Sequence, residues 1–569
     1  MKESSTGETI LRHTLKNAYD FNGSINPKVV MGLTLRDHPE LKSDVPKLMK
    51  EIEIIAKDVT KLSKEEIKTR LQKLAPELLI EKKEEVKGPL KPLPNAENGK
   101  VIVRIAPSPS GPLHIGHAYG ASLNYEYAKM YNGKFILRIE DTNPENIYDP
   151  AYELIPEDAQ WLTDNKLNQT IIQSERLGKY YDYAEKLVTM GKAYVCTCDA
   201  DEFREKKARG EACSCRSLET KEQQLRYAKM FNEYAEGEAV LRIKTDIKDK
   251  NPAMRDFSIM RINEHLHPKT GKEQKVWPLM VFSVAVDDHD LGITHVLNGK
   301  DHHDNGIKEK MIMEYLRWKT PEYKHWGRIN FEGFKLSTTK TKLAIEQKEY
   351  SGWDDIRLMT LMALRRRGYQ AGAFRRYALE IGLSLNDKTV SREEFWKNIN
   401  SFNKEIIESK SNRYFFIDNP VEANILNAPP EKVLLDLHPD FPQRGKRELL
   451  VKGLVLIAQS DLSRLGEGAV HRLMDYCNFE IKDGKWKFVS ESLDDYKHAK
   501  IKGSIVHWLP AENKLKVEVL QENNTIVSGI GEEAMKELKV GDLVQLERRY
   551  FARLDKKEND KLTFWYLHK

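Results

Sequence analysis

Two histidines three residues apart lie at the start of a predicted helix, directly after a loop rich in glycine and proline. The stretch reads PSPSGPLHIGH over residues 107–117 and follows the apolar run VIVRIA. Side chains at positions i and i+3 of a helix point the same way, so His114 and His117 present two N–H donors together. A helix N-terminus adds free backbone amides and partial positive charge, which favours an anion. This pattern predicts a site for a nucleoside triphosphate that reacts at its α-phosphorus.

On the two residues alone, a zinc site or a pair of surface histidines remains an alternative. The neighbouring elements favour nucleotide chemistry instead. A buried strand at 101–106, a helix from Ile115 to Tyr131 that ends at Asn132-Gly133, and a second strand at 134–141 predict a β-α-β unit. Parallel sheets of this kind bind their ligands at the carboxyl ends of the strands, which is where the histidine loop lies.

The motif PSPSGPLHIGH resembles the HIGH signature of the class I aminoacyl-tRNA synthetases, in the form carried by the glutamyl and glutaminyl enzymes. GFKLSTTK (333–340) is similar to the KMSKS-like loop of that family. RIEDTN (138–143), GWDDIRLMTLMALRRRG (352–368) and the ending VQLERRYFARLD are also similar to this subfamily. The resemblance covers residues 99–569, and residues 1–98 resemble, less specifically, the N-terminal extension of the archaeal and eukaryotic branch.

The resemblance implies a multidomain α/β protein in which a Rossmann-type parallel sheet carries the HIGH and KMSKS-like loops. In chain order we expect an N-terminal helical extension and linker (1–98), the first half of the catalytic domain (99–173), an inserted domain that binds the tRNA acceptor end (174–276), the second catalytic half (277–330), the KMSKS-like loop with a helical connecting domain (331–412), and antiparallel β-barrels that bind the anticodon (413–569). SKEE at 63–66 predicts a capping box that opens a helix, and residues 81–100 predict a linker.

The bulk composition fits this architecture. The chain has 569 residues, of which 40% are hydrophobic and 31% charged, with a formal net charge of +5. A chain of this length is expected to form several domains, and any nucleic acid must be bound by local basic patches because the overall field is weak. The N-terminal residues lack the apolar stretch of a signal peptide, and no apolar run could span a bilayer. We therefore expect a cytoplasmic protein without membrane association. The protein is also expected to be a monomer.

The family activates an amino acid with ATP and Mg²⁺ and transfers the acyl group to tRNA. The positions that match its ATP site are Pro107, Gly111, His114, Gly116, His117, Lys335, Ser337 and Lys340. The resemblance assigns catalytic roles to the two histidines, which hold the α-phosphate, and to Lys335, which neutralises the β- and γ-phosphates. The family usually has a second lysine directly after the serine, where this chain has Thr338, so Lys340 or Lys342 is expected to replace it. A solvated lysine-rich loop without this role is the alternative.

Five positions are expected to bind L-glutamate. Arg104 ends a buried strand against the nucleotide loop, where a bidentate cation suits a γ-carboxylate; a structural salt bridge is the alternative. Ser108 and Glu140 match the positions that hold the α-amino group in the family. Met280 and Asn298 stand where relatives usually carry a tyrosine and an arginine that help to select glutamate over glutamine. HVLNGKDHHDN and the N-terminal extension favour glutamate, with the glutaminyl enzymes as the alternative.

Four of the five cysteines form two C-x-C pairs, Cys196/Cys198 and Cys213/Cys215, separated by fourteen residues. In a reducing compartment this clustering favours a metal over a disulfide. Four thiolates form a closed tetrahedral set that is typical of structural Zn²⁺, whereas chance clustering of reduced cysteines is the alternative. Cys477 stands alone and is expected to be a buried apolar residue.

The expected partners are tRNA(Glu) and, with relaxed specificity, tRNA(Gln). Clustered arginines bind phosphates or stack on bases, and the candidates are Arg365, Arg366, Arg367, Arg375, Arg376, Arg548 and Arg549. A solvated helix face is the alternative for the first five. Two other classes of protein remain open. A nucleotidyltransferase that makes a small cofactor would lack the Lys335 loop and the cysteine insertion, and an RNA-binding relative without catalysis would have a damaged histidine pair.

Overall fold

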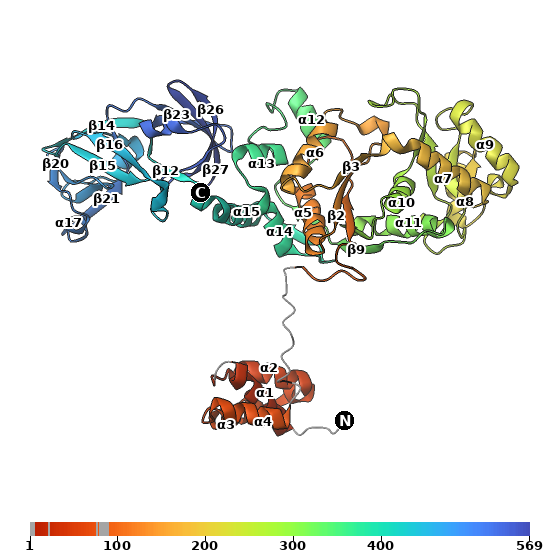
Figure 1. The fold of residues 1–569 in the computed structure, drawn as a ribbon, viewed down its shortest axis with the longest axis horizontal. Coiled ribbons are helices and arrows are strands. Elements are labelled where there is room, and N and C mark those ends of the chain that lie inside the picture. Colours follow the sequence, from red (N-terminus) through yellow and green to blue (C-terminus); the bar gives the residue numbers. More distant parts are fainter. Residues whose placement is uncertain (1–5, 21–22, 76–77, 79–89) are drawn as a thin grey trace. The chain divides into compact units, whose positions relative to one another are not determined.

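The computed structural model describes residues 6–20, 23–75, 78 and 90–569. By contacts the chain divides into two compact units, Met1–Gly88 and Pro89–Lys569 (Figure 1), and each is described by itself. Residues 81–89 of the predicted linker lie outside the described residues. No helix in the described part of the chain is long and apolar enough to cross a membrane.

The smaller unit is helical throughout its described elements. These are α1 (Thr6–Asp20), α2 (Pro27–Asp37), the 3₁₀ turn η1 (Pro39–Asp44), α3 (Val45–Val59) and α4 (Lys64–Leu74). Helix α3 buries Leu48, Ile52 and Val59, whose spacing of three to four residues places them on one face. Helix α4 opens with the predicted capping box, in which the N–H of Glu66 donates to Ser63 Oγ and the N–H of Ser63 donates to the Glu66 carboxylate.

The larger unit begins with a three-stranded parallel sheet in the order β1-β2-β3. Its elements are β1 (Ile102–Ile105), α5 (Ile115–Met130), β2 (Lys134–Ile139), η3 (Pro144–Asn146), α6 (Ala151–Leu162) and β3 (Gln169–Ile172). Helix α5 ends because Asn132 adopts a left-handed conformation with φ of 48°. At Gly133 a Cβ would lie 2.1 Å from the carbonyl oxygen of Val101, so the turn requires glycine there. The predicted β-α-β unit is confirmed.

A second parallel pair extends this region. The elements are α10 (Met280–Asp290), β8 (His295–Gly299), η7 (Lys300–His302), α11 (His303–Tyr315) and β9 (Glu322–Trp326). Strands β8 and β9 are parallel, and the N–H of Thr294 donates to the carbonyl of Ile102 at 3.0 Å. This bond places the start of β8 beside β1, so the two halves of the predicted catalytic domain come together.

Between these halves lies an antiparallel sheet in the order β4-β5-β6-β7. The elements are η4 (Gln173–Arg176), α7 (Leu177–Thr189), β4 (Ala193–Cys196), α8 (Ala200–Arg209), η5 (Ser214–Ser217), α9 (Thr220–Asn232), β5 (Val240–Ile243), η6 (Pro252–Met254), β6 (Ser258–Ile262) and β7 (Val276–Pro278). Trp277, Phe282 and Ile312 are each 0% exposed within one shared core. Because this core includes α10 and α11, the packed body of the insertion continues past the expected boundary at residue 276.

Four helices and a short parallel strand pair connect the catalytic region to the C-terminal strands. They are β10 (Ile329–Phe331), α12 (Thr338–Glu346), α13 (Leu361–Arg367), α14 (Ala371–Ile381), β11 (Lys388–Val390), α15 (Arg392–Ile407) and η8 (Glu408–Lys410). Helix α14 packs on both α5 and α15, and Phe374, Tyr377 and Ile399 are buried in the same core as α5. The connecting helices therefore share one core with the parallel sheet.

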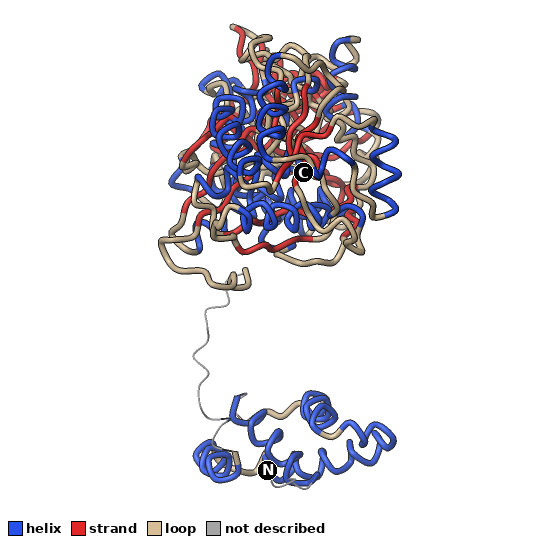
Figure 2. Tube along the Cα trace, turned by 90° about the vertical axis from the view of Figure 1, so that its right-hand side faces the viewer, coloured by secondary structure: helices blue, strands red, loops and turns tan. Residues whose placement is uncertain are grey.

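The C-terminal region contains two seven-stranded sheets and the ribbon β15–β16. Their elements are β12 (Asn412–Tyr414), β13 (Phe416–Asp418), β14 (Pro420–Leu426), β15 (Glu431–Asp436), η9 (Pro442–Arg444), β16 (Lys446–Val451), β17 (Leu454–Ala458), α16 (Gln459–Leu462), β18 (Val470–Leu473), β19 (Asn478–Lys482), β20 (Lys485–Ser490), α17 (Leu493–Lys497), β21 (Lys502–Val506), β22 (Leu509–Pro510), β23 (Lys516–Leu520), β24 (Ile526–Gly531), η10 (Glu533–Glu537), β25 (Leu543–Leu546), β26 (Tyr550–Glu558) and β27 (Lys561–His568). Figure 2 colours the strands of the chain red and its helices blue. Most pairs are antiparallel as expected, but β12–β25, β14–β20, β18–β21 and β23–β27 are parallel. The strand patterns themselves do not encode these long-range pairings.

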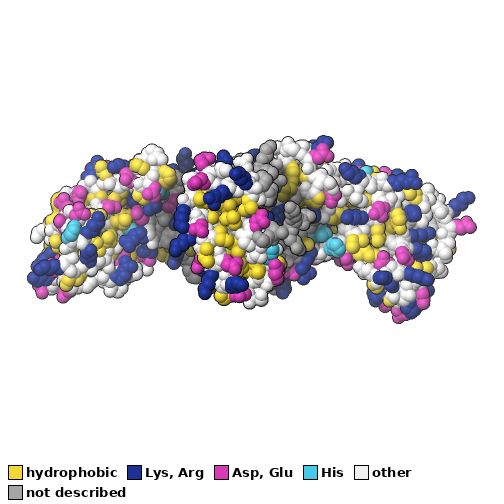
Figure 3. All heavy atoms as spheres, turned by 90° about the horizontal axis from the view of Figure 1, so that it is seen from below, with side chains coloured by type: hydrophobic (Ala, Val, Ile, Leu, Met, Phe, Trp, Pro, Cys, Tyr) yellow, Lys and Arg dark blue, Asp and Glu magenta, His cyan; other side chains and the backbone are white. Residues whose placement is uncertain are grey.

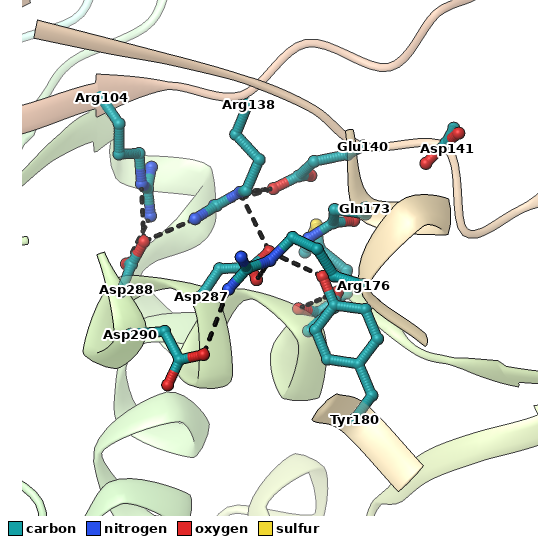
Figure 4. A network of polar contacts seen from close by, with 12 residues as sticks. Arg104, Arg138, Glu140, Asp141, Gln173, Arg176, Tyr180, Asp287, Asp288 and Asp290 are labelled. Carbon is teal, nitrogen blue, oxygen red and sulfur yellow. Dashed lines mark hydrogen bonds and ion pairs between the residues drawn. The ribbon is translucent and has the colours of Figure 1, made fainter. Parts of the chain in front are cut away.

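A buried ion-pair network joins β1, β2 and α10 (Figure 4). Arg138 is 0% exposed and donates to Asp288 at 2.6 Å and to Glu140 at 2.9 Å. Arg104 donates to the same Asp288 carboxylate at 3.0 Å. Burial favours the neutral carboxyl, but the charges of Arg104 and Arg138 outweigh it and hold the pKa of Asp288 below its usual value. The network thus clamps the helix to the sheet.

The network continues to the start of the insertion. Asp287 accepts from Arg176 Nε at 2.8 Å, from Gln173 Nε2 at 2.9 Å and from the Tyr180 hydroxyl at 2.9 Å. Arg176 also donates to Asp290 at 3.2 Å. Every oxygen of the two buried aspartates is therefore bonded, which is what a buried charge requires.

We expect Asp288→Ala to destabilise the larger unit because Arg104 and Arg138 would stay buried without a counter-charge. The loss of unfolding free energy is about 3–5 kcal/mol, measured by urea or thermal unfolding. Asp201→Ala is the matched control, since Asp201 forms an exposed pair with Arg204 that is worth less than about 1 kcal/mol. Equal stability of the two variants would contradict the role assigned to the network.

Candidate active site

Eight of the predicted residues line one cavity of about 330 Å³ at the carboxyl ends of the parallel strands. They come from β1 and the loop after it, the first turn of α5, the residue directly after β2, the start of α10 and the end of β8. The eight are Arg104, Pro107, Ser108, Gly116, His117, Glu140, Met280 and Asn298. The fold thus gathers positions nearly two hundred residues apart in the sequence around one space.

His114 and His117 both use Nδ1 to cap helix α5, and this fixes which ring nitrogen carries the proton. The N–H of Gly116 donates to Nδ1 of His114 at 3.1 Å, and the N–H of His114 donates to Nδ1 of His117 at 3.3 Å. Because Nδ1 accepts in both rings, the proton of each neutral imidazole is on Nε2. The ring centroids lie 4.0 Å apart. Two neighbouring Nε2–H donors therefore remain at the helix N-terminus.

Both imidazoles are neutral at physiological pH. Burial and then the neighbouring His117 lower the pKa of His114 to about 2, and burial lowers the pKa of His117 to about 4. The rings can therefore donate hydrogen bonds to a phosphate without carrying charge. This agrees with the two N–H donors that the sequence pattern predicts.

The KMSKS-like loop contacts the histidine loop at Gly111. A Cβ at Gly111 would lie 2.4 Å from Cγ2 of Thr338 and 3.1 Å from the ring of Trp353. The segment that follows is also bound, because the N–H of Ile115 donates to the carbonyl of Met359 at 3.2 Å. Glycine at position 111 therefore allows this close approach, and Thr338 fills the space beside it with a methyl group.

The lysines of that loop are available for an anion. His114 and Lys335 line one small pocket, and Ser337 caps helix α12 by accepting from the N–H of Lys340 at 3.4 Å. Lys335 and Lys340 are exposed, and neither forms an ion pair with any described residue. Lys342 lies over an aromatic ring at 5.5 Å. Of the two candidates to replace the missing second lysine, Lys340 has the freer ammonium group.

Arg104 and Glu140 line the cavity, and each also forms an ion pair, with Asp288 and Arg138 respectively. Nε and Nη2 of Arg104 donate to the two carboxylate oxygens of Asp288 at 3.2 and 3.0 Å. The salt bridge that the sequence left as an alternative is present, yet Nη1 and the second N–H of Nη2 remain for a ligand. Oε1 of Glu140 accepts twice from Arg138, at 3.2 and 2.9 Å, so Oε2 is left to accept another donor.

The remaining cavity residues carry little charge. Met280 is 36% exposed at the start of α10, and Oδ1 of Asn298 accepts from Nδ1 of His325 at 2.7 Å. Glu309 of α11 also lines the cavity, and burial together with the nearby Asp288 raises its pKa to about 7. Sequence reasoning missed Glu309 and His325, because no local pattern separates them from surface residues.

Asp158 is a third residue that the sequence did not reveal. It is 0% exposed on α6, and its carboxylate accepts from the N–H of Leu113 at 3.1 Å. Burial raises the pKa of Asp158 to about 7. Because Leu113 directly precedes His114, this hydrogen bond holds the histidine loop against α6.

The four clustered cysteines lie together as the spacing predicts. Sγ of Cys196 is 3.9 Å from Sγ of Cys213, and Sγ of Cys198 is 3.7 Å from Sγ of Cys215. All four sulfur atoms lie within 4.8 Å of one another. Cys477 is 0% exposed in the C-terminal core, which agrees with the apolar role expected for it.

The arginines proposed for tRNA are largely engaged within the protein. Arg367 is 3% exposed and donates to the carbonyl of Leu567 at 2.9 Å, so its predicted phosphate contact is wrong: the guanidinium is buried between α13 and β27. The other four arginines of the connecting helices form ion pairs: Arg365 with Glu157, Arg366 with Asp354 and Asp555, Arg375 with Asp164, and Arg376 with Glu405. These pairs join the connecting helices to neighbouring elements.

Arg548 and Arg549 differ from each other. Arg549 pairs with Asp418, whereas Arg548 is exposed between β25 and β26 and bonds only the carbonyl of Ile505, at 3.1 Å, among the described residues. Figure 3 shows basic and acidic side chains interspersed over the face that it presents. Among the proposed tRNA contacts in the described residues, Arg548 is exposed and forms no ion pair.

Comparison with known proteins decides the family. Residues 100–409 match the family described as tRNA synthetases class I (E and Q), catalytic domain. Residues 411–501 and 505–555 match two families described as the anticodon-binding domain of the same enzymes. The chain belongs to the class I tRNA synthetases of the E and Q group.

Full-length relatives agree with this assignment. The chain is 44% identical over 563 residues to the glutamate–tRNA ligase of Methanothermobacter thermautotrophicus, covering 99% of each protein. It is 42% identical over 564 residues to the glutamate–tRNA ligase of Methanocaldococcus jannaschii, covering 99% of this chain and 100% of that protein. A solved glutamate tRNA ligase of Elizabethkingia meningosepticum matches at 22% identity with a TM-score of 0.38, covering 55% of this chain and 70% of that one.

Membership in the E and Q synthetases confirms the family and the fold class that the sequence motifs predict. It also excludes the small-cofactor nucleotidyltransferase as an interpretation. A class I synthetase uses ATP with Mg²⁺ and acts on tRNA.

The lowered pKa of the half-buried His117 predicts a pH dependence of stability. The pKa of His117 is about 4 in the folded protein and about 6.5 when unfolded, so the unfolded chain binds more protons between these values. Stability is therefore full above about pH 6.5 and falls as the pH drops, by at most about 1.4 kcal/mol per pH unit for this group.

Unfolding midpoints between about pH 7.5 and pH 5 should consequently fall less steeply for His117→Asn than for the unmodified protein. His265→Asn is the control, because His265 is exposed, and it should leave the slope unchanged. Identical slopes for all three proteins would contradict the lowered pKa of His117.

Proposed function

We propose that this chain is a glutamate–tRNA ligase that activates L-glutamate with ATP and esterifies it to tRNA(Glu). The observation that carries the proposal is the convergence of the nucleotide and amino-acid residues on one cavity. The curated relatives covering 99% of the chain bear the name glutamate–tRNA ligase. These relatives do not favour the glutaminyl alternative.

In the activation step, a glutamate carboxylate oxygen attacks the α-phosphorus of ATP and pyrophosphate leaves, which yields glutamyl-adenylate. Negative charge grows on the α-phosphate oxygens in the transition state, and preorganised donors stabilise such charge most effectively in a dry site. The Nε2–H groups of His114 and His117 supply these donors. Lys335 and Lys340 carry the positive charge for the departing β- and γ-phosphates, while Gly116 and Pro107 form the adjoining wall of the cavity.

The same cavity orients the amino acid. Oε2 of Glu140, with Ser108, accepts from the α-ammonium group. The remaining N–H groups of Arg104 and the side chain of Asn298 meet the γ-carboxylate, and Met280 forms an apolar wall. Binding thereby presents the α-carboxylate to ATP, which supplies the positional part of catalysis.

Transfer follows when a hydroxyl of the terminal adenosine of tRNA attacks the acyl carbon and AMP leaves. We propose that the insertion at 174–276 binds the acceptor end and that the strands of 413–569 bind the anticodon, with Arg548 among the contacts. We further propose that the enzyme acts as a monomer and that tRNA(Gln) is a second substrate.

Aminoacylation of purified tRNA(Glu) and tRNA(Gln), each assayed with glutamate and with glutamine, tests the proposal. Glutamate should be attached to tRNA(Glu). His117→Ala should reduce activation, measured by ATP–pyrophosphate exchange in the presence of tRNA, by about 10²–10³-fold because one transition-state donor is lost. Preferential attachment of glutamine would overturn the substrate, and normal exchange by His117→Ala would overturn the role of the histidine.

We also propose that the four cysteines hold a structural Zn²⁺. Zn–S bonds of about 2.3 Å in a tetrahedron place sulfur atoms about 3.8 Å apart, and two of the sulfur pairs here lie 3.9 and 3.7 Å apart. A closed set of four thiolates leaves no open position, so the metal would stabilise the insertion rather than take part in the reaction.

Metal analysis should find about one zinc per chain, and Cys215→Ser should lose the metal and lower the unfolding midpoint. The buried Cys477 provides the control, because Cys477→Ser should keep the zinc content of the unmodified protein. A preparation that folds and binds tRNA equally well without zinc would contradict the structural role.

A further inference from the structure

Asn298 and His325 lie opposite each other on neighbouring parallel strands. They are paired residues in the register of β8 and β9, and Nδ1 of His325 lies 2.7 Å from Oδ1 of Asn298. Asn298 lines the cavity proposed for glutamate, whereas His325 stands behind it and does not line that cavity. His325 therefore contacts the site through Asn298.

This hydrogen bond determines which end of the Asn298 amide faces the substrate. An amide oxygen only accepts, so the contact requires the proton of His325 to be on Nδ1. With Oδ1 engaged in this way, the amide NH₂ of Asn298 is left to donate. No described residue accepts a hydrogen bond from that NH₂.

We propose that His325 is a specificity-determining positioning residue, which turns the Asn298 amide so that its NH₂ group meets the γ-carboxylate of glutamate. This inference rests on the proposed function. Both oxygens of a carboxylate accept hydrogen bonds, whereas the amide of glutamine has one acceptor oxygen and an NH₂ group that only donates. An NH₂ donor together with Arg104 therefore suits the carboxylate better. The opposite amide orientation would present an acceptor and would favour glutamine instead.

The residues around Asn298 give the orientation of its amide a direct effect on which ligand the cavity binds. The side chain of Met280 has no donor, and two N–H groups of Arg104 are bonded to Asp288. The donors proposed for the γ-carboxylate are therefore the remaining N–H groups of Arg104 and the NH₂ group of Asn298. Burial and the nearby His303 lower the pKa of His325, which keeps the ring neutral and makes its proton position depend on Asn298. The ring of His303 lies edge-on to it with centroids 5.3 Å apart and restricts its rotation.

The test compares His325→Leu, which removes the donor, with His325→Asn, whose amide nitrogen lies near the place of Nδ1. The quantity measured is kcat/KM for glutamate divided by kcat/KM for glutamine, in ATP–pyrophosphate exchange with tRNA present. His325→Leu should lower this ratio by about tenfold, the effect of one neutral hydrogen bond. It should do so mainly through KM for glutamate, with KM for ATP unchanged. His325→Asn should retain a ratio within about threefold of the unmodified enzyme.

A double-mutant cycle with Asn298→Ala shows whether His325 acts through Asn298. In the Asn298→Ala background, His325→Leu should leave the ratio where Asn298→Ala alone puts it. Additive effects, or an unchanged ratio in His325→Leu itself, would overturn the proposal. If the unmodified enzyme instead fails to activate glutamate, the proposed function fails first, so the two failures are distinguishable.

Discussion

The desolvation of Arg138 is the constraint on which the catalytic region depends. This guanidinium is 0% exposed, and an unpaired charge at such depth costs several kcal/mol. It is therefore stable only if Asp288 of α10 docks against β2 in one register, which also brings Arg104 to the same carboxylate. Because Glu140 completes the pairing of Arg138, the network that holds the sheet and helix together also orients two walls of the cavity.

The two histidines at the start of α5 also combine a structural contact with a contact available to a ligand. Nδ1 of each ring accepts a hydrogen bond from a backbone N–H at the start of the helix. The Nε2–H group of each ring is therefore left to bind a ligand. Burial then keeps the rings uncharged, so donor geometry is set before any substrate arrives. Preorganisation of this kind avoids the reorganisation that a solvated histidine would undergo as charge develops.

The arginines of the connecting helices have a different role from the one that their clustering indicates. Arg366 bonds Asp354 beside Trp353 and also Asp555 of β26, so it ties the segment packed on the histidine loop to the C-terminal strands. Arg367 is buried against β27. A cluster of basic residues in the sequence therefore indicates either a surface that binds phosphates or ion pairs between elements of the protein. Only the positions of the acidic partners in the structure distinguish these two roles.

The sequence by itself determined the local structure and the family: the β-α-β unit, the capping box at Ser63, the HIGH and KMSKS-like loops, and the cysteine pairs. Each of these depends on residues close together in the chain, whose dihedral preferences and hydrogen bonds are local. Tertiary structure alone decided which acid neutralises Arg138, that Asp158 supports Leu113, that His325 faces Asn298, and that several C-terminal strands pair in parallel. These contacts join residues far apart in the chain, so they depend on how the elements pack, and no local pattern records them.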